Sequence, residues 1–189
     1  MTYASRKASR RKTQGNGFTL VELLVVISVA AILAAIAVPS FKNTILMNRA
    51  DTASNQFVAA LSMARSEAVR QGTQVSVSSN SNSTNWGTQG WSVTVLSNQA
   101  ATGTSASLGL SSPMTSYGTV SSVIFGPMGR MPAGTAAQSF LFCPDGSDVT
   151  KAYLVTVAPS GRARVVAPSN GQAPANDLGT VETACNNPQ

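Results

Sequence analysis

The sequence contains no histidine, two cysteines and seven acidic residues among 189. Without histidine, Ser-His-Asp triads, histidine acid–base catalysis and imidazole-dependent metal sites are excluded. Two cysteines are too few for a four-cysteine zinc site. Charged residues make up 11% of the chain, against about 25% in average soluble domains. The surface must therefore owe its polarity mainly to uncharged side chains, and we expect no enzyme, cofactor or metal site.

The net charge of +6 is concentrated at the start of the chain. From Phe18 onward, 8 basic and 7 acidic residues leave a charge of only +1. An argument for nucleic-acid binding from overall charge therefore fails, and any such binding must depend on a local patch. The other five positive charges precede residue 17 with no acid among them: Arg6, Lys7, Arg10, Arg11 and Lys12.

Residues 18–38 form an apolar run in which only Thr19, Glu22 and Ser28 are polar. As a helix this run is about 30 Å long, which matches the hydrocarbon thickness of a membrane. The positive charges before it predict a cytoplasmic N-terminus, with the rest of the chain on the other side. The two cysteines would then lie in an oxidising compartment.

The apolar run allows two interpretations. A secretory signal peptide would use the small residues of 35–37 as a cleavage site and release a protein beginning at Val38. Glu22 argues against this interpretation, because a carboxylate inside a membrane costs roughly 2.5–3.5 kcal/mol on insertion scales. A charged residue in such a position is a functional hypothesis, and its partner should be identifiable.

The segment Gly17 to Ile27, with Pro39 downstream, resembles the class III leader of type IV pilins and type II secretion pseudopilins. The resemblance implies that a prepilin peptidase cleaves after Gly17 and N-methylates Phe18. It also implies that Glu22 neutralises the terminal amine of a neighbouring subunit during assembly. This pairing is physically reasonable, because a buried carboxylate and a buried ammonium reduce each other's desolvation cost.

After the apolar run, small and apolar residues recur at helical spacing and form one stripe. We expect one helix over residues 18–71 that ends at Gly72, with its second half packed on a globular domain. Arg65 and Arg70 are expected on the solvated face of this helix. The stripe consists of Ala50, Ser54, Phe57, Leu61, Ala64 and Ala68.

From Thr73 the hydrophobic period changes to two, which is typical of strands. Val75 and Val77 pair with Trp91, Val93 and Val95 in an expected hairpin, with Trp91 in the core and Trp86 anchoring the loop. Residues 97–118 read as a long, weakly structured insertion, and the tail after Ala167 has few apolar residues. Further strands are expected at 120–125, 140–142, 153–157 and 162–166, with turns at 126–129 and 159–161.

This order resembles the GspH/FimT family of type IV minor pilins and type II secretion pseudopilins. The matching motifs are the helix 61–70, Trp86-Gly87 with Gly90-Trp91, Phe125-Gly126 with Gly129-Arg130, and Gly161-Arg162-Ala163-Arg164. The resemblance implies the α+β type IV pilin fold, a long N-terminal helix packed on antiparallel β-sheets. The expected segments are a leader (1–17), a transmembrane assembly helix (18–38), its amphipathic continuation (39–72) and a periplasmic or extracellular β-rich domain (73–189).

The Gly161–Arg164 motif is the main candidate for chemistry. On a strand, Arg162 and Arg164 would point to the same face about 6.6 Å apart, which suits adjacent phosphates of a nucleic-acid strand. Gly161 would leave the backbone open to close approach, and Lys151 and Arg130 are candidates to extend the patch. In FimT-type minor pilins this motif is associated with DNA capture during natural transformation. The structural alternative is that the two arginines protect a sheet edge.

Cys143 and Cys185 are 42 residues apart, and in an oxidising compartment we expect them to form one disulfide. The chain-entropy model gives about 4 kcal/mol for closing such a loop. A reactive thiol or an intermolecular bridge is the alternative, but the even count and the absence of a nearby activating base favour the disulfide.

The resemblance leaves two functions open. The first is a minor pilin that contributes to DNA uptake, and the second is a GspH-like pseudopilin with a structural role in type II secretion. Either protein would begin in the bacterial inner membrane, as a single pass with its C-terminus in the periplasm, and then enter a pilus or pseudopilus. Its partners would be prepilin peptidase, other pilins or pseudopilins and, for the first function, DNA.

Overall fold

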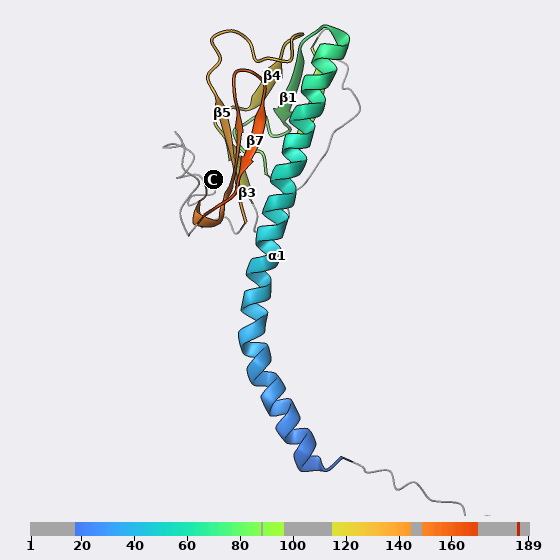
Figure 1. The fold of residues 1–189 in the computed structure, drawn as a ribbon, viewed down its shortest axis with the longest axis vertical. Coiled ribbons are helices and arrows are strands. Elements are labelled where there is room, and N and C mark those ends of the chain that lie inside the picture. Colours follow the sequence, from blue (N-terminus) through green and yellow to red (C-terminus); the bar gives the residue numbers. More distant parts are fainter. Residues whose placement is uncertain (1–17, 88, 97–114, 145–148, 170–184, 186–189) are drawn as a thin grey trace, which may run out of the picture. The chain divides into compact units, whose positions relative to one another are not determined.

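The computed structural model describes residues 18–87, 89–96, 115–144, 149–169 and 185. Contacts within the chain divide it into one unit up to Phe41 and a second unit from Lys42. The elements, shown in Figure 1, are α1 (Leu20–Gln71), β1 (Val75–Ser79), β2 (Trp91–Val95), β3 (Thr115–Gly118), β4 (Ser122–Phe125), β5 (Gln138–Cys143), the 3₁₀ helix η1 (Val149–Lys151), β6 (Tyr153–Val157) and β7 (Ala163–Val166).

The first unit contains the apolar beginning of α1. Its large apolar side chains, from Leu20 to Ile36, are exposed. Among the described residues, α1 is the one helix that is long and apolar enough to cross a membrane. The expected leader, residues 1–17, lies outside the described residues.

The part of α1 in the second unit turns its small and apolar stripe inward. All six residues of the predicted stripe are buried, from Ala50 to Ala68. The helix ends at Gln71, and Gly72 follows with a φ of 63°. The Thr73 N–H donates to the Ala68 carbonyl at 3.3 Å, as in a glycine-terminated helix. The predicted helix and its end are therefore confirmed within two residues.

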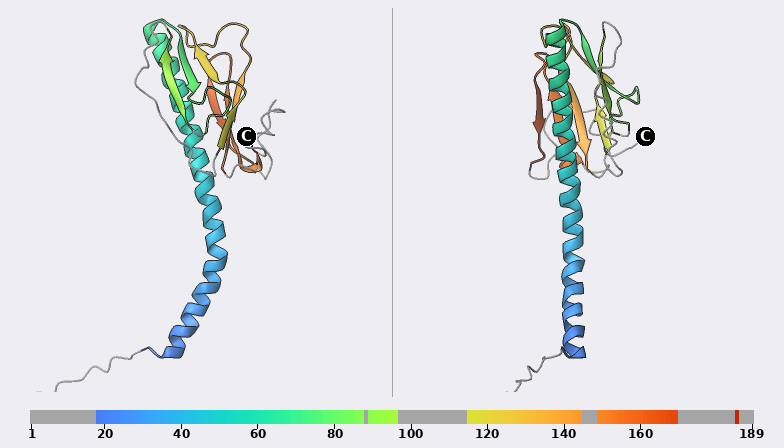
Figure 2. Two further views of the ribbon diagram at one scale, coloured as in Figure 1. Left: turned by 180° about the vertical axis from the view of Figure 1, so that it is seen from behind. Right: turned by 90° about the vertical axis from the view of Figure 1, so that its right-hand side faces the viewer.

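Two antiparallel sheets lie alongside this part of α1 (Figure 2). The strand orders are β2-β1-β4 and β3-β5-β6-β7. The predicted hairpin is confirmed, since β1 pairs with β2 from Val75↔Val95 to Ser79↔Trp91. The order places β7 at one edge of the second sheet, beside β6.

Phe57 of α1 is the centre of the core between helix and sheets. Its ring lies 4.9–5.7 Å from those of Trp86, Trp91, Phe140 and Phe142. Trp86 also donates a hydrogen bond from Nε1 to the Val120 carbonyl at 2.8 Å. Both tryptophans are buried, so Trp91 is a core residue as predicted.

The prediction of a weakly structured insertion over 97–118 is wrong at its end. Residues 115–118 form β3, which pairs with β5 from Thr115↔Cys143 to Gly118↔Phe140. The inward positions of β3 are Ser116 and Gly118, so the strand lacks the alternating large apolar residues by which strands are recognised. Residues 97–114 lie outside the described residues.

A second, smaller core cluster forms around the disulfide between Cys143 and Cys185, whose Cα atoms are 6.0 Å apart. The pairing expected from the sequence is therefore present. Most of the tail after Ala167 lies outside the described residues. Both core clusters, every strand pairing and the disulfide lie after Lys42. The packing seen among the described residues of the second unit therefore lies within residues 42–189.

Candidate nucleic-acid interface

Arg162 and Arg164 both lie on the outward side of the second sheet. Strand β7 begins at Ala163, so Arg162 directly precedes it. Both arginines are exposed, whereas Ala163 and Val165 are half-buried and pack against the core. This alternation shows that the two arginines share the solvent face, as the sequence pattern predicts.

Gly161 has a role in packing that the sequence did not predict. It is buried in the turn before β7, where its N–H donates to the Ala158 carbonyl at 2.8 Å and its φ is 78°. A Cβ on Gly161 would lie 2.1 Å from the carbonyl oxygen of Gly129. The missing side chain of Gly161 therefore makes room for the neighbouring turn.

That neighbouring turn carries Arg130. The Gly129 N–H donates to the Gly126 carbonyl at 2.8 Å, and the Met131 N–H donates to the Pro159 carbonyl at 3.1 Å. Arg130 follows Gly129 in one turn, and Arg162 follows Gly161 in the other. Because the two turns are in contact, the backbones of Arg130 and Arg162 lie close together. Lys151 does not lie close to Arg162. The pairing Leu154↔Val166 places Lys151 beyond the opposite end of β7.

Arg65 of α1 connects the helix to both turns. Its Nε donates to the Gly129 carbonyl at 2.8 Å, across 64 residues of sequence, and its side chain is half-buried. The prediction that Arg65 lies on a solvated helix face is therefore wrong. Its helical position is outside the apolar stripe, but the stripe does not reveal that a distant turn covers this position.

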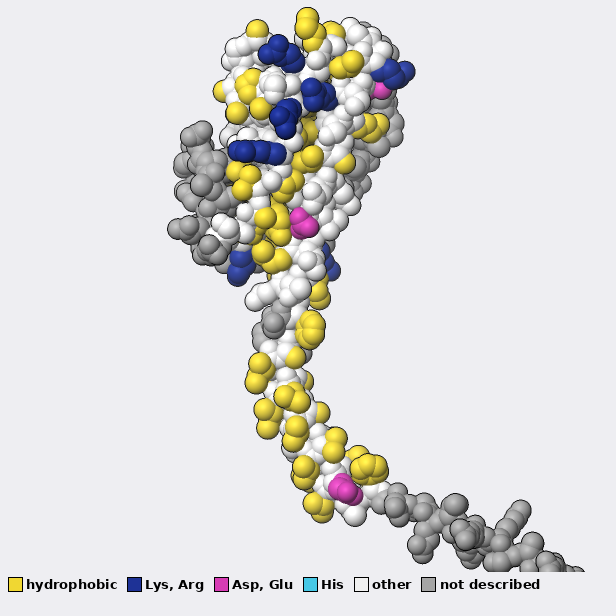
Figure 3. Space-filling model, viewed as in Figure 1, with side chains coloured by type: hydrophobic (Ala, Val, Ile, Leu, Met, Phe, Trp, Pro, Cys, Tyr) yellow, Lys and Arg dark blue, Asp and Glu magenta, His cyan; other side chains and the backbone are white. Residues whose placement is uncertain are grey.

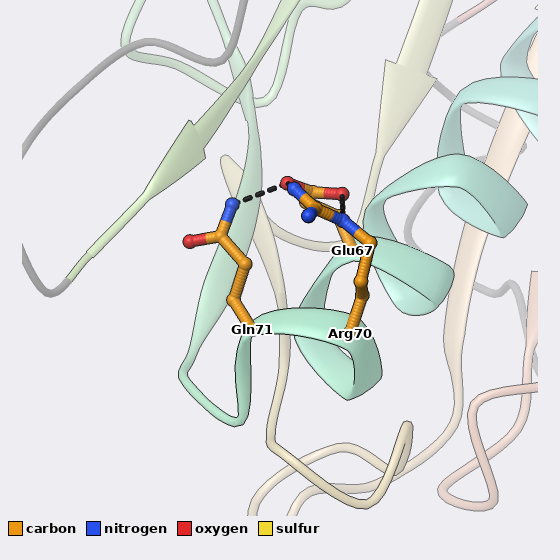
Figure 4. Close-up of polar contacts among 3 residues, drawn as sticks. All are labelled: Glu67, Arg70 and Gln71. Carbon is orange, nitrogen blue, oxygen red and sulfur yellow. Dashed lines mark hydrogen bonds and ion pairs between the residues drawn. The ribbon is translucent and has the colours of Figure 1, made fainter.

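Arg70, five residues later on α1, has the exposed position that was predicted for it. Its guanidinium and the Gln71 amide both turn onto the Glu67 carboxylate (Figure 4). The Arg70 Nη2 and the Glu67 Oε1 are 2.5 Å apart. The hydrogen bonds from Arg70 and then from Gln71 lower the pKa of Glu67 to about 2. Arg70 is thus already engaged by an acid of its own helix.

An open groove of about 560 Å³ lies between α1 and the segment 161–163. Arg65 and Arg162 both line it, and among the residues that the structure describes no carboxylate does. Figure 3 shows Lys and Arg side chains gathered on the upper part of the face that carries β7. The other lining residues are Ser62, Ser66, Val69, Gly161 and Ala163.

The start of α1 holds the residues expected to act in processing and assembly. Phe18 is exposed, and Gly17 lies outside the described residues. The Glu22 Oε2 accepts hydrogen bonds from the Thr19 N–H at 3.1 Å and the Thr19 hydroxyl at 3.0 Å. The Glu22 N–H donates to the Thr19 Oγ1 at 3.2 Å. This capping box orients the Glu22 carboxylate, and a Thr-x-x-Glu signature in the sequence could have revealed it.

The arrangement suits binding to anions. Within the described parts of the chain, no group of His, Cys, Asp and Glu residues could hold a metal ion. The exposed guanidinium groups are permanently charged and form planar pairs of donors that match phosphate oxygens.

Comparisons with known proteins agree with the fold. Crystal structures of the type IV minor pilin FimU from Pseudomonas aeruginosa match at 25% sequence identity in two crystal forms. The TM-scores are 0.53 and 0.50, over 65% and 64% of this chain and 92% and 94% of FimU. The minor pseudopilin EpsH of the Vibrio cholerae type 2 secretion system is 14% identical, with a TM-score of 0.49 over 65% of this chain and 99% of EpsH. No curated protein matches the sequence.

Two family models match different parts of the chain. Residues 13–38 match the prokaryotic N-terminal methylation motif, and residues 53–161 match the model described as type II transport protein GspH. The second match alone covers more than half of the 189 residues. The chain therefore belongs to the GspH/FimT family of minor pilins and pseudopilins, and it has the α+β type IV pilin fold.

Proposed function

We propose that this chain is a minor type IV pilin that binds DNA through Arg162 and Arg164 and so contributes to DNA uptake. It is inserted in the inner membrane with its C-terminus in the periplasm, cleaved by prepilin peptidase after Gly17 and N-methylated at Phe18. It then joins other pilins in the pilus. The match of residues 13–38 to the methylation motif and the likeness to FimU support the pilin part of this proposal.

The observation that carries the DNA-binding part is the exposed pair formed by Arg162, directly before the edge strand β7, and Arg164 within that strand. Among the described residues, neither arginine forms an ion pair, in contrast to Arg70. Alternation along the strand directs both guanidinium groups to solvent, where each can take one phosphate of a strand. A few phosphate contacts give weak, salt-sensitive binding, which several copies along a fibre would strengthen.

Assembly uses Glu22 at the start of α1. In the single chain its carboxylate accepts hydrogen bonds from Thr19. In the filament, the terminal ammonium of a neighbouring subunit's Phe18 provides a charged partner for Glu22, which relieves the cost of burying both groups. The capping contacts keep the carboxylate at the helix start, where it can meet that partner.

A GspH-like pseudopilin with a structural role in type II secretion is the second candidate. The match of residues 53–161 to the type II transport protein GspH favours it. In that function the two arginines would protect the edge of the second sheet, and DNA binding would be absent.

DNA binding by residues 42–189 tests the first candidate. The variant Arg162→Ala/Arg164→Ala should bind duplex DNA at least about tenfold more weakly than the unaltered domain, since each lost charge-assisted hydrogen bond contributes about 1.5–3 kcal/mol. Arg49→Ala/Arg70→Ala is the matched control, because it removes the same charge from exposed helix positions. Equal binding by the two double variants, or no binding by the unaltered domain, would leave the structural role as the better account.

The N-terminus of the protein recovered from cells tests processing separately. Mass spectrometry should find a methylated Phe18 as the first residue, and Glu22→Ala should abolish recovery in filaments. A mature chain beginning at Val38 would instead show that a signal peptide is removed and would exclude a filament role.

A further inference from the structure

The groove between α1 and the segment 161–163 lies next to Arg162 and Arg164. The DNA contacts proposed for these two arginines do not give the groove itself a role. We propose that this groove binds one phosphodiester of a nucleic-acid strand between Arg65 and Arg162, while Arg164 takes the neighbouring phosphate. This inference rests on the proposed DNA-binding function and adds a helix residue, and a second wall, to the binding site.

Arg65 is held in a fixed orientation at one wall of the groove. Its Nε donates to the Gly129 carbonyl at 2.8 Å. This hydrogen bond leaves the terminal Nη1 and Nη2 without a partner among the described residues. A guanidinium fixed through Nε and open at its terminal nitrogens is ready to donate two parallel hydrogen bonds to a phosphate.

Arg162 stands at the facing wall. The position of a Cβ on Gly161 would lie 3.3 Å from the Arg65 Nε, so the backbone just before Arg162 almost touches the Arg65 side chain. Both arginines line the same groove. The groove is therefore bordered by one arginine from a helix and by another from the start of a strand.

The lining of the groove fits a phosphate in charge and in size. Its described residues include two arginines and no carboxylate, so an anion between the two cations would be stabilised by both of them. Ser62 is exposed on the same wall as Arg65 and adds a hydroxyl donor, whereas the Ser66 hydroxyl already donates to the Ser62 carbonyl at 2.8 Å. The volume of about 560 Å³ leaves room for the sugar next to the phosphate.

Protection of arginines from chemical modification tests the site in the unaltered, full-length chain in uncharged detergent micelles. An arginine-specific dicarbonyl reagent, read by mass spectrometry, should modify Arg65 and Arg162 several-fold more slowly when a short oligothymidylate is present. Arg49 and Arg70 should react at the same rate with and without it. Inorganic phosphate at the same phosphate concentration should protect neither Arg65 nor Arg162, because only a strand also reaches Arg164; protection by it would contradict a strand-binding site.

The pattern of protection separates this inference from the proposed function. If Arg162 and Arg164 are protected while Arg65 reacts unchanged, the groove does not bind phosphate, although DNA binding by β7 stands. If the oligonucleotide does not bind at all, the proposed function fails, and the groove site fails with it.

Variants test whether Arg65 and Arg162 share one phosphate. The effects of Arg65→Gln and Arg162→Ala on affinity should be strongly non-additive, whereas those of Arg65→Gln and Arg164→Ala should add. Arg65→Lys keeps the charge and a donor for the Gly129 carbonyl, so it preserves the fold but loses the paired donors. It should weaken binding about threefold to tenfold, and an affinity equal to that of the unaltered protein would overturn the proposal.

Discussion

Arg65 and Arg70 lie five residues apart on the same helix, but Arg70 makes local contacts, whereas Arg65 makes a long-range contact. Arg70 forms its contacts with Glu67, three residues earlier. Arg65 forms its hydrogen bond with Gly129, 64 residues later. The first arrangement needs only a helix, whereas the second exists only when the helix has packed on the sheets. Long-range packing thus fixes Arg65 without neutralising its charge, whereas Arg70 is paired with an acid of its own helix.

The largest effect should come from removing the packing that the Arg65 contact requires. Phe57→Ala should lower the free energy of unfolding by about 3–5 kcal/mol, because Phe57 contacts both tryptophans and both sheets. The Arg65 contact should be lost with it, while the Glu67–Arg70 pair should persist wherever the helix remains. Urea denaturation of residues 42–189 measures this, with the exposed Gln56→Ala as the control. A loss below about 1 kcal/mol would contradict a core centred on Phe57.

The second largest effect on stability should come from the contact between the turn that contains Gly161 and the turn that contains Gly129. Gly161→Ala should cost about 2–4 kcal/mol, because a positive φ is combined with overpacking against the Gly129 carbonyl. Gly134→Ala is the matched control, since Gly134 also has a positive φ but has nothing within 4 Å of a Cβ. It should cost only about 1 kcal/mol. Equal losses in the two variants, measured by denaturation, would contradict close contact between the turns.

A smaller effect should distinguish the two arginines directly. Arg65→Gln should lower the free energy of unfolding by about 1.5–3 kcal/mol, since the hydrogen bond from a charged donor to the carbonyl of the buried Gly129 is lost. Arg70→Gln should leave stability almost unchanged, because exposed pairs contribute little. The measurement is the denaturation midpoint of each of the two variants in one denaturant series. Equal midpoints would contradict the distinction between long-range and local contacts.

The smallest effect should be the pH dependence of the local pair. The pKa of Glu67 is lowered to about 2 from 4.5, so the pair stabilises the fold above pH 4.5 and this contribution disappears as the pH falls towards 2. Glu67→Gln should remove a small part of the fall in melting temperature over this range. An unchanged profile in that variant would show that the exposed pair has no influence on stability.

Much of the fold could be predicted because local patterns specify it. The helical stripe from Ala50 to Ala68 and the alternation of Trp91, Val93 and Val95 each repeat with a period that one face of an element requires. Strand β3 was not predicted, because one of its inward positions lies tightly against Trp86 and Phe140. That position has room only for a glycine, Gly118. A strand whose inward residues are small carries no hydrophobic signal.

The site was predictable only in part, for a related reason. The motif around Arg162 and Arg164 is contiguous, so the sequence shows both arginines on one face. The fixed orientation of Arg65 and the packing role of Gly161 depend on contacts with Gly129. Those contacts join three segments that are distant in sequence, and no local period encodes them.

The salt dependence of DNA binding tests the central claim, that the arginines of β7 bind the phosphate backbone, most directly. For duplex DNA, each phosphate contact adds about −0.9 to the slope of log K against log salt. The slope for Arg162→Ala/Arg164→Ala should therefore be shallower than that for Arg49→Ala/Arg70→Ala by about 1.8, although both variants lose the same charge. Identical slopes for the two variants would show that β7 contacts no phosphates and would contradict the claim.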